Sequence, residues 1–271
     1  MQYGMIIDLE RCVGCHACTI ACKAEWEVPV EFHRNWVYRI GPSLVDNEMA
    51  STYYPGLCNH CNEPVCVPEC PADLEEVTFT DKKTGKTKTM EIAATWKDPF
   101  NGTVQIDKDR CIGCGACVDA CPYEARYINP DLVDDVSEDG KADKCTYCMP
   151  RVEAGLQPAC VQTCIAGARI FGDLDDPKSE VAQYIKNGAK GIEPDGGELG
   201  PNSRYFGKKK DISLLFSTHT PELADLGHVR RRAMLASMVK PAVKKAKSIG
   251  LIGIAGALIA KSITDSDSSK E

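Results

Sequence analysis

The sequence predicts an α+β protein of two tandem, duplicated domains related by a pseudo-twofold, followed by a basic and apolar helical tail. The duplication is predicted by two repeats, and the tail by a change of charge. Met5–Cys22 reads MIIDLERCVGCHACTIAC and returns 99 residues later, without a gap, as VQIDKDRCIGCGACVDAC in Val104–Cys121. A second pair, PVCVPEC and PACVQTC, recurs after 94 residues. The repeated unit therefore contains two cysteine groups, and the chain carries it twice.

Each half predicts the same order of elements. Tyr3–Asp8 and Thr103–Asp107 are expected to be short strands that lead into cysteine loops, and the last cysteine of each loop is expected at the start of a helix. Strand-like alternation resumes at Ala125–Ile128 and Ala168–Gly172. Strand, loop, helix and strand make half of a βαββαβ unit, so the sequence predicts two ferredoxin-like domains.

Two segments lie outside this repeat. Residues 75–103 form an insertion, in which a KKTGK turn (Lys82–Lys86) between Val77–Thr80 and Thr87–Ile92 predicts a β-hairpin. Residues 187–203 are rich in Gly, Pro and Asn, which predicts a loop.

Sixteen cysteines in 271 residues indicate disulfides or metal. The first residues, MQYGMIIDLERC, show no basic segment followed by an apolar one, so we expect no secretory signal on this chain. A chain that folds in a reducing compartment favours thiolates on metal over disulfides.

The cysteines fall into four groups with the spacing of iron–sulfur ligands. Groups one to four are Cys12, Cys15, Cys18, Cys22; Cys58, Cys61, Cys66, Cys70; Cys111, Cys114, Cys117, Cys121; and Cys145, Cys148, Cys160, Cys164. In a C-x2-C-x2-C-x3-C run, three thiolates surround one cluster and the fourth serves a neighbouring cluster. Group four alone would also suit zinc. Groups one and three would not, because each places three cysteines within seven residues, which crowds a tetrahedral ion. The sequence therefore predicts four [4Fe–4S] clusters and leaves open one [3Fe–4S] cluster.

At these motifs the sequence resembles the four-cluster iron–sulfur subunits of the molybdopterin oxidoreductase complexes. The resemblance covers about residues 1–225. It rests on CVGCHACTIACKAEWEVP (12–29), RNWVYRI (34–40), CNHCNEPVCVPECP (58–71), CIGCGACVDACPYEARYI (111–128), KCTYC (144–148) and PACVQTCIAGARIFGDLDDP (158–177). Among such complexes we favour the quinone reductase complex of sulfate reducers.

The resemblance implies ligand sets that cross the order of the groups. The four implied sets are Cys12/Cys15/Cys18/Cys164, Cys22/Cys145/Cys148/Cys160, Cys58/Cys61/Cys66/Cys121 and Cys70/Cys111/Cys114/Cys117. One domain would then comprise 1–57 with 129–186, and the other 58–128. A connecting segment, 187–227, and the tail, 228–271, complete the chain.

The same resemblance implies a non-catalytic electron-transfer subunit with two protein partners. These are a large molybdopterin-oxidoreductase-like subunit and an integral membrane quinone-interacting subunit, with a multihaem cytochrome c as a further candidate; no nucleic acid is expected. The implied location is the periplasmic face of a membrane, after export with a partner, and the cytoplasmic face is the alternative. A free polyferredoxin and a zinc-rich scaffold are the competing functions.

The tail differs from the body in charge. Residues 228–261 contain eight Lys or Arg and no Asp or Glu, although the whole chain has a net charge of −7. The stretch IGLIGIAGALIA (249–260) is uncharged but too short for an ordinary membrane-spanning helix. A basic flank beside it suits an anionic lipid surface, so we expect membrane contact through 228–263, with packing on a soluble subunit as the alternative.

Overall fold

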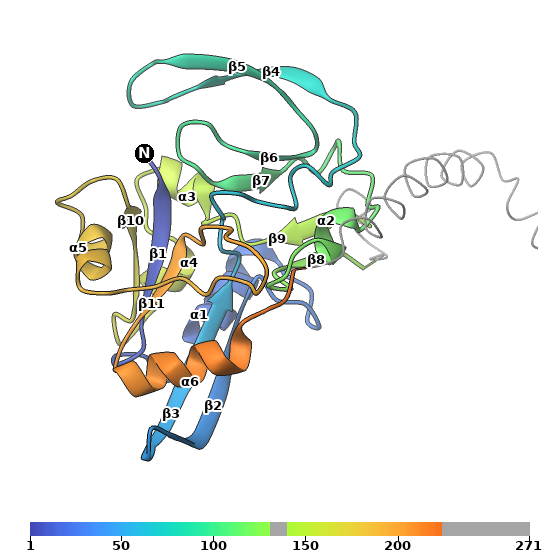
Figure 1. The fold of residues 1–271 in the computed structure, drawn as a ribbon. Helices are drawn as coiled ribbons and strands as arrows, with labels where there is room; N and C mark the ends of the chain where they lie inside the picture. The colour runs from blue at the N-terminus through green and yellow to red at the C-terminus, as the bar shows by residue number, and fades with distance from the viewer. Residues whose placement is uncertain (131–139, 224–271) are drawn as a thin grey trace, which may run out of the picture.

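The computed structural model describes residues 1–130 and 140–223 of the chain. A three-stranded sheet in the order β10–β1–β11 lies near its centre (Figure 1). Strand β1 (Tyr3–Asp8) pairs antiparallel with β10 (Arg169–Asp173) and parallel with β11 (Ser203–Phe206). Because β1 precedes cysteine group one and β10 follows group four, this sheet joins the first and fourth groups.

Both faces of β1 are covered. Met5, Ile6 and Ile7 are fully buried, and successive side chains of a strand point to opposite faces. Ile6 packs in a small cluster with Val181 of helix α5 (Glu180–Lys186), while Met5 and Ile7 belong to the main core. The continuous apolar run of β1 follows from this two-sided burial.

A long hairpin leaves the centre of the molecule. Strands β2 (Asn35–Val45) and β3 (Glu48–Leu57) pair antiparallel, and helix α6 (Lys209–His219) lies across them (Figure 1). The turn residues Asp46 and Asn47 both have positive φ, 50° and 64°, as a type I′ hairpin turn requires. The sequence prediction missed this hairpin, although Asp and Asn are residues that tolerate positive φ in a turn.

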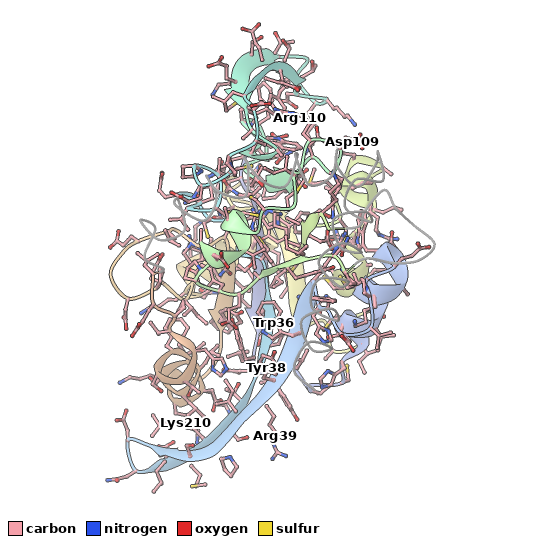
Figure 2. The ribbon with its side chains drawn as sticks, turned by 90° about the vertical axis from the view of Figure 1, so that its right-hand side faces the viewer. Trp36, Tyr38, Arg39, Asp109, Arg110 and Lys210 are labelled. Atoms are coloured by element: carbon pink, nitrogen blue, oxygen red, sulfur yellow. The ribbon has the colours of Figure 1, made fainter. Side chains whose placement is uncertain are left out.

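Labelled side chains of β2 and α6 lie at successive positions along this hairpin. Figure 2 shows Trp36 and Tyr38 along β2, and Lys210 of α6 nearer to the hairpin end. The Lys210 ammonium lies 3.1 Å from the Glu48 carboxylate, at the first residue of β3. Helix α6 therefore contacts the hairpin through both apolar packing and an ion pair.

The second half of the chain pairs its strands differently from the first. Strand β7 (Val104–Ile106) pairs with β6 (Thr95–Lys97), which the insertion supplies. Strand β8 (Arg126–Ile128) pairs with β9 (Ala142–Lys144), which precedes group four. The expected strands before and after group three are thus present, in two separate two-stranded sheets.

The hairpin predicted in the insertion is confirmed. Strand β4 (Glu75–Thr80) pairs antiparallel with β5 (Thr87–Ile92), and the pair projects from the body (Figure 1). Arg110 holds its base, because the guanidinium lies 3.3 Å from the Glu75 carboxylate and donates to the Ile92 carbonyl at 2.8 Å. Figure 2 shows Arg110 beside Asp109 below the hairpin.

The helices beside the cysteines are mostly short. They are α1 (Ala17–Trp26), α2 (Ala116–Asp119), α3 (Met149–Glu153) and α4 (Ala159–Gln162). The expectation that the last cysteine begins a helix is wrong in detail. Cys22 lies inside α1, whereas Cys121 and Cys164 follow the ends of α2 and α4.

Residues 187–203 are loop-like, as expected, with isolated bridges at Lys190 and Asp195 before β11 begins. The predicted tail, 228–271, lies outside the described residues. Within 1–130 and 140–223, none of the helices combines the length and the apolar character needed to cross a membrane. The division into two ferredoxin-like domains stays a prediction.

Candidate iron–sulfur centres

All sixteen cysteines lie in the described part of the chain, and each carries a free thiol. Nine are buried, six are half-buried, and only Cys15 is exposed. Because these buried thiols form no disulfides, their clustering indicates shared binding sites for a metal or metal cluster.

The first thiol set lines one cavity beside the end of β1. It consists of Cys12, Cys15, Cys18 and Cys164. The Cys12 amide donates to the Asp8 carbonyl at 3.0 Å, so the loop turns as soon as the strand ends. The Asp8 amide donates to the Ala168 carbonyl at 2.8 Å, which brings the end of group four against the start of group one. The strand pairing, not the sequence spacing, places Cys164 here.

Glycine is required inside two of the cysteine loops. Gly14 has φ 65°, and a Cβ there would lie 2.2 Å from the Tyr53 ring. Gly113, its repeat equivalent, has φ 63°, and a Cβ would lie 1.8 Å from the Gly140 carbonyl oxygen. A side chain at these positions is excluded both by backbone conformation and by the neighbouring atoms.

The second thiol set lines a neighbouring cavity. It consists of Cys22, Cys145, Cys148 and Cys160, all buried. The indole Nε1 of Trp26 donates to the Cys148 sulfur at 3.2 Å. Burial and the neighbouring thiols raise the pKa of Cys22 to about 12, and burial raises the pKa of Cys160 to about 11.

The third and fourth thiol sets gather in the other half of the molecule. Cys61 has Cys58, Cys66 and Cys121 as its interacting thiols, and these four form the third set. Cys114 has Cys117, Cys70 and Cys111, and these form the fourth set. Burial and Cys66 and Cys58 together raise the pKa of Cys121 to about 12.

The four sets follow one another in a line. Thiols of adjacent sets also interact: Cys18 with Cys160, Cys145 with Cys58, and Cys66 with Cys117. Each of these pairs joins two neighbouring sets electrostatically, so the order is first, second, third, fourth. The two inner sets are buried except for half-buried Cys121, whereas the first set contains the exposed Cys15 and the fourth contains two half-buried cysteines. Access to solvent therefore lies at the ends of the line.

The chemistry of these donors fits iron–sulfur clusters. Thiolate is the ligand that such clusters require. Burial raises the pKa of one thiol or more in each set, as at Cys12, Cys22, Cys61 and Cys114, so a thiolate there needs a compensating positive charge, which bound iron supplies. Within the described ranges, no three His, Cys, Asp or Glu side chains converge on the position of a single ion. Each cavity of the first two sets is surrounded by its four sulfurs instead.

Hydrogen-bond donors also point at the sulfurs. The Ala168 amide donates to Cys164 at 3.2 Å, and the Arg126 guanidinium donates to Cys66 at 3.0 Å. Arg169 approaches Cys160, with 4.0 Å between nitrogen and sulfur. Such donors stabilise negative charge on the sulfurs, which is how proteins adjust cluster potentials. The two arginines escaped the prediction from sequence.

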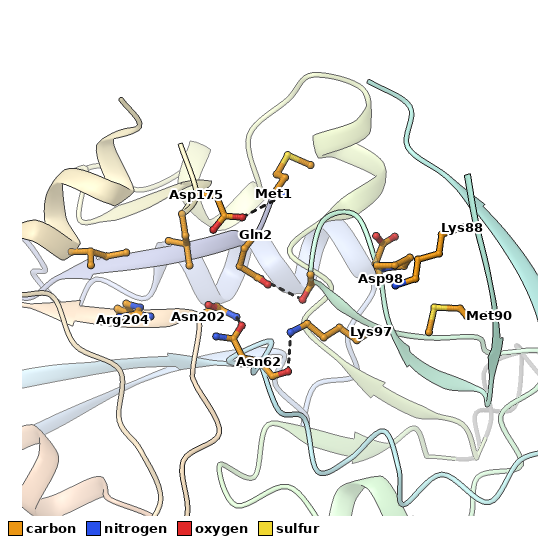
Figure 3. Close-up of a pocket in the computed structure, with 14 residues that line it drawn as sticks. Met1, Gln2, Asn62, Lys88, Met90, Lys97, Asp98, Asp175, Asn202 and Arg204 are labelled. Atoms are coloured by element: carbon orange, nitrogen blue, oxygen red, sulfur yellow. Dashed lines mark hydrogen bonds and ion pairs between the residues drawn. The ribbon is translucent and has the colours of Figure 1, made fainter. Parts of the chain in front are cut away.

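Another cavity holds none of the cysteines. It opens between β1 and the insertion, where Lys97 donates to the Asn62 carbonyl at 2.9 Å (Figure 3). On its other side the amino terminus of Met1 lies 3.3 Å from the Asp175 carboxylate. The first contact attaches the insertion to the loop after Cys61, and the second attaches the N-terminus to the residues that follow β10.

Comparison with known proteins gives the same chemistry. A family described as a 4Fe-4S dicluster domain matches residues 49–174, and one described as a 4Fe-4S binding domain matches residues 3–24.

Three relatives come from reductase complexes. A tetrathionate reductase subunit of Salmonella typhimurium is 39% identical over 210 residues, which is 76% of this chain and 72% of the relative. A putative dimethyl sulfoxide reductase iron-sulfur subunit of Halobacterium salinarum is 37% identical, over 79% of this chain and 86% of the relative. A polysulfide reductase polypeptide of Wolinella succinogenes is 35% identical, over 68% of this chain and 83% of the relative.

Proposed function

Because this protein belongs to the iron–sulfur subunits of the molybdopterin oxidoreductase complexes, we propose that it relays single electrons along four [4Fe–4S] clusters between two partner subunits. The chain is an electron-transfer subunit and not the catalytic one, in keeping with its relatives. The linear order of the four thiol sets, buried in the middle and accessible at the ends, is the observation that carries the proposal.

In this proposal each thiol set holds one cluster. The cluster supplies the one-electron chemistry, and the chain supplies the thiolates, the order and the exclusion of water. Two clusters are held jointly by groups one and four, and two by groups two and three. This division corresponds to two ferredoxin-like domains, 1–57 with 129–186 and 58–128.

The ends of the line are the proposed contact points for partners. The first set contains Cys15, the one exposed cysteine, and the fourth set contains the half-buried Cys70 and Cys114. We assign one end to a molybdopterin-containing catalytic subunit and the other to a membrane quinone-interacting subunit, with a multihaem cytochrome c as a further electron partner. The tetrathionate, dimethyl sulfoxide and polysulfide reductase relatives indicate the class of complex.

Ligand assignment is tested by paired substitutions in the purified full chain. Cys164→Ser and Cys15→Ser should perturb the same electron paramagnetic resonance signal, because both residues belong to the first set. Cys160→Ser is the matched control, since it lies four residues from Cys164 but belongs to the second set. If Cys164→Ser and Cys160→Ser alter the same signal and Cys15→Ser alters another, the proposed sets are wrong.

The cluster content and the assembly are tested separately. Four [4Fe–4S] clusters correspond to about 16 Fe and 16 sulfide per chain, and zinc without sulfide would refute the proposal. Purification from the native membrane should yield a catalytic and a membrane subunit with this chain. A chain that isolates alone from gently solubilised membranes would indicate a free polyferredoxin. Protease access in spheroplasts tests the proposed periplasmic face.

A further inference from the structure

A third internal match in the sequence includes two arginines. Residues 116–126 read ACVDACPYEAR and residues 159–169 read ACVQTCIAGAR. Arg126 stands five residues after Cys121, and Arg169 stands five residues after Cys164. In both copies a short helix precedes the arginine, which is the first residue of a strand, β8 or β10. The two arginines therefore occupy equivalent positions, Arg126 beside the third and fourth thiol sets and Arg169 beside the first and second.

Arg126 lies between the third and fourth thiol sets. Its side chain is buried, with 4% of the residue exposed, and its Nη2 donates to the Cys66 sulfur at 3.0 Å. The thiols that lie near enough to interact electrostatically with it are Cys66, Cys117, Cys58 and Cys121. Cys117 belongs to the fourth set and the other three belong to the third, so one guanidinium faces both sets.

Arg169 repeats this arrangement in the other half. It is also 4% exposed, and its Nη1 lies 4.0 Å from the Cys160 sulfur. The thiols that act on it are Cys160, Cys18 and Cys145, and its own charge acts in turn on Cys12. Cys12 and Cys18 belong to the first set, and Cys145 and Cys160 belong to the second.

Neither guanidinium has the partner that a buried arginine usually finds. Arg34, similarly buried, forms two hydrogen bonds to the Asp143 carboxylate. Within the described residues, the hydrogen bonds of Arg126 and Arg169 run to a cysteine sulfur or to Thr95, and none runs to a carboxylate. Arg126 Nε and Arg169 Nη2 have no hydrogen-bond partner there. A buried arginine charge is costly unless negative charge compensates it.

We propose that Arg126 and Arg169 are a duplicated pair of redox-tuning residues, each holding a fixed positive charge between the two clusters of its half and raising the reduction potential of both. The inference rests on the proposed four-cluster function.

A positive charge at these positions raises the reduction potentials because adjacent clusters are both negatively charged. Four thiolates give a cluster net negative charge, and reduction by one electron adds another negative charge in a buried site. A second anionic cluster nearby opposes that step, since charges interact strongly where water is excluded. A guanidinium between them stabilises the reduced form of either cluster. Arginine suits the place because it stays protonated and its planar fork can donate in two directions.

The test is a redox titration of the full-length holoprotein, followed by electron paramagnetic resonance with dithionite as reductant. Arg126→Gln should lower the equilibrium constant for reduction of the third- and fourth-set clusters by about tenfold or more. This corresponds to a downward shift of the midpoint potential of about 59 mV for a one-electron couple. The other two clusters should stay unchanged. Arg169→Gln should give the reciprocal pattern, so each variant is the control for the other.

Arg151→Gln is a further matched control. Arg151 lies in group four but pairs with the Glu25 carboxylate at 2.8 Å near the surface, and its loss should leave all four midpoints unchanged. The inference is overturned if the Gln variants retain four clusters and their midpoints equal those of the wild type. A packing role alone would lower cluster occupancy without moving any midpoint.

Should the Gln variants lose their clusters, Arg126→Lys and Arg169→Lys decide the matter. Lysine keeps a positive charge at the same place, so the clusters of the affected half should be retained with midpoints close to those of the wild type. Lys variants that lose their clusters as the Gln variants do, or whose midpoints fall by about 59 mV or more although the charge is kept, overturn the inference. A wild-type chain with fewer than four clusters refutes the proposed function instead, so the two failures are distinguishable.

Discussion

Asp143 on β9 is a buried carboxylate that binds side chains from three separate segments of the chain. Its carboxylate accepts hydrogen bonds from Arg34 at 2.7 and 2.8 Å, from Lys108 at 2.8 Å and from the Tyr127 hydroxyl. Burial opposes ionisation of Asp143, but the charges of Arg34 and Lys108 outweigh it and hold the pKa below its usual value. The carboxylate is therefore ionised at neutral pH, and Asp143→Asn removes a charge with little change of shape.

The expected loss of folding free energy in Asp143→Asn follows from the burial of the Asp143–Arg34 ion pair. The side chains of Asp143 and Arg34 are 4% and 8% exposed, so the variant leaves the Arg34 guanidinium buried without its counter-charge. Removing one partner of such a pair costs about 3–5 kcal/mol. If the loss falls mainly on the native state, unfolding should accelerate by roughly 10²-fold or more, because each ~1.4 kcal/mol is tenfold.

The assay is the rate at which the holoprotein loses its visible cluster absorbance in urea at about pH 7.5, where Asp143 is ionised. Glu25→Gln is the control, since it breaks the more exposed pair with Arg151 and should cost less than about 1 kcal/mol. The double variant Arg34→Met, Asp143→Leu removes both buried charges and should unfold more slowly than Asp143→Asn. Unfolding of Asp143→Asn within about fivefold of the wild type would refute the reasoning, because that is less than about 1 kcal/mol.

Two further predictions concern the cysteine loops. Gly113→Ala should abolish the fourth-set cluster, measured as iron content, because its Cβ would meet the Gly140 carbonyl oxygen. Gly85→Ala is the control, since it has a similar φ of 70° but open space, and it should keep full iron content. Trp26→Phe removes the donor to Cys148 and should lower the second-set potential by roughly 20–60 mV, the equivalent of one hydrogen bond. An unchanged second-set midpoint would show that the indole only packs there.

The chemistry of the sites follows from the amino-acid sequence alone. Cysteine spacing is a local property, and three thiolates within seven residues impose a cluster on the loop whatever surrounds it. The repeats revealed the duplication, and the Gly-containing turn identified the hairpin of β4 and β5. Local chain geometry decides all of these, so they can be read without long-range information.

Which cysteine groups lie together depends on the three-dimensional fold. Cys164 reaches the first set because β10 pairs with β1, through contacts such as Ile6 with Ile170, and no local pattern specifies that pairing. The resemblance to a family had implied the crossed sets, whereas spacing alone left them open. The place of Arg169 depends on this pairing, and the place of Arg126 depends on the pairing of β8 with β9. The spacing of the cysteines shows that they are cluster ligands, but the pairing of strands far apart along the chain determines which cysteines share a set.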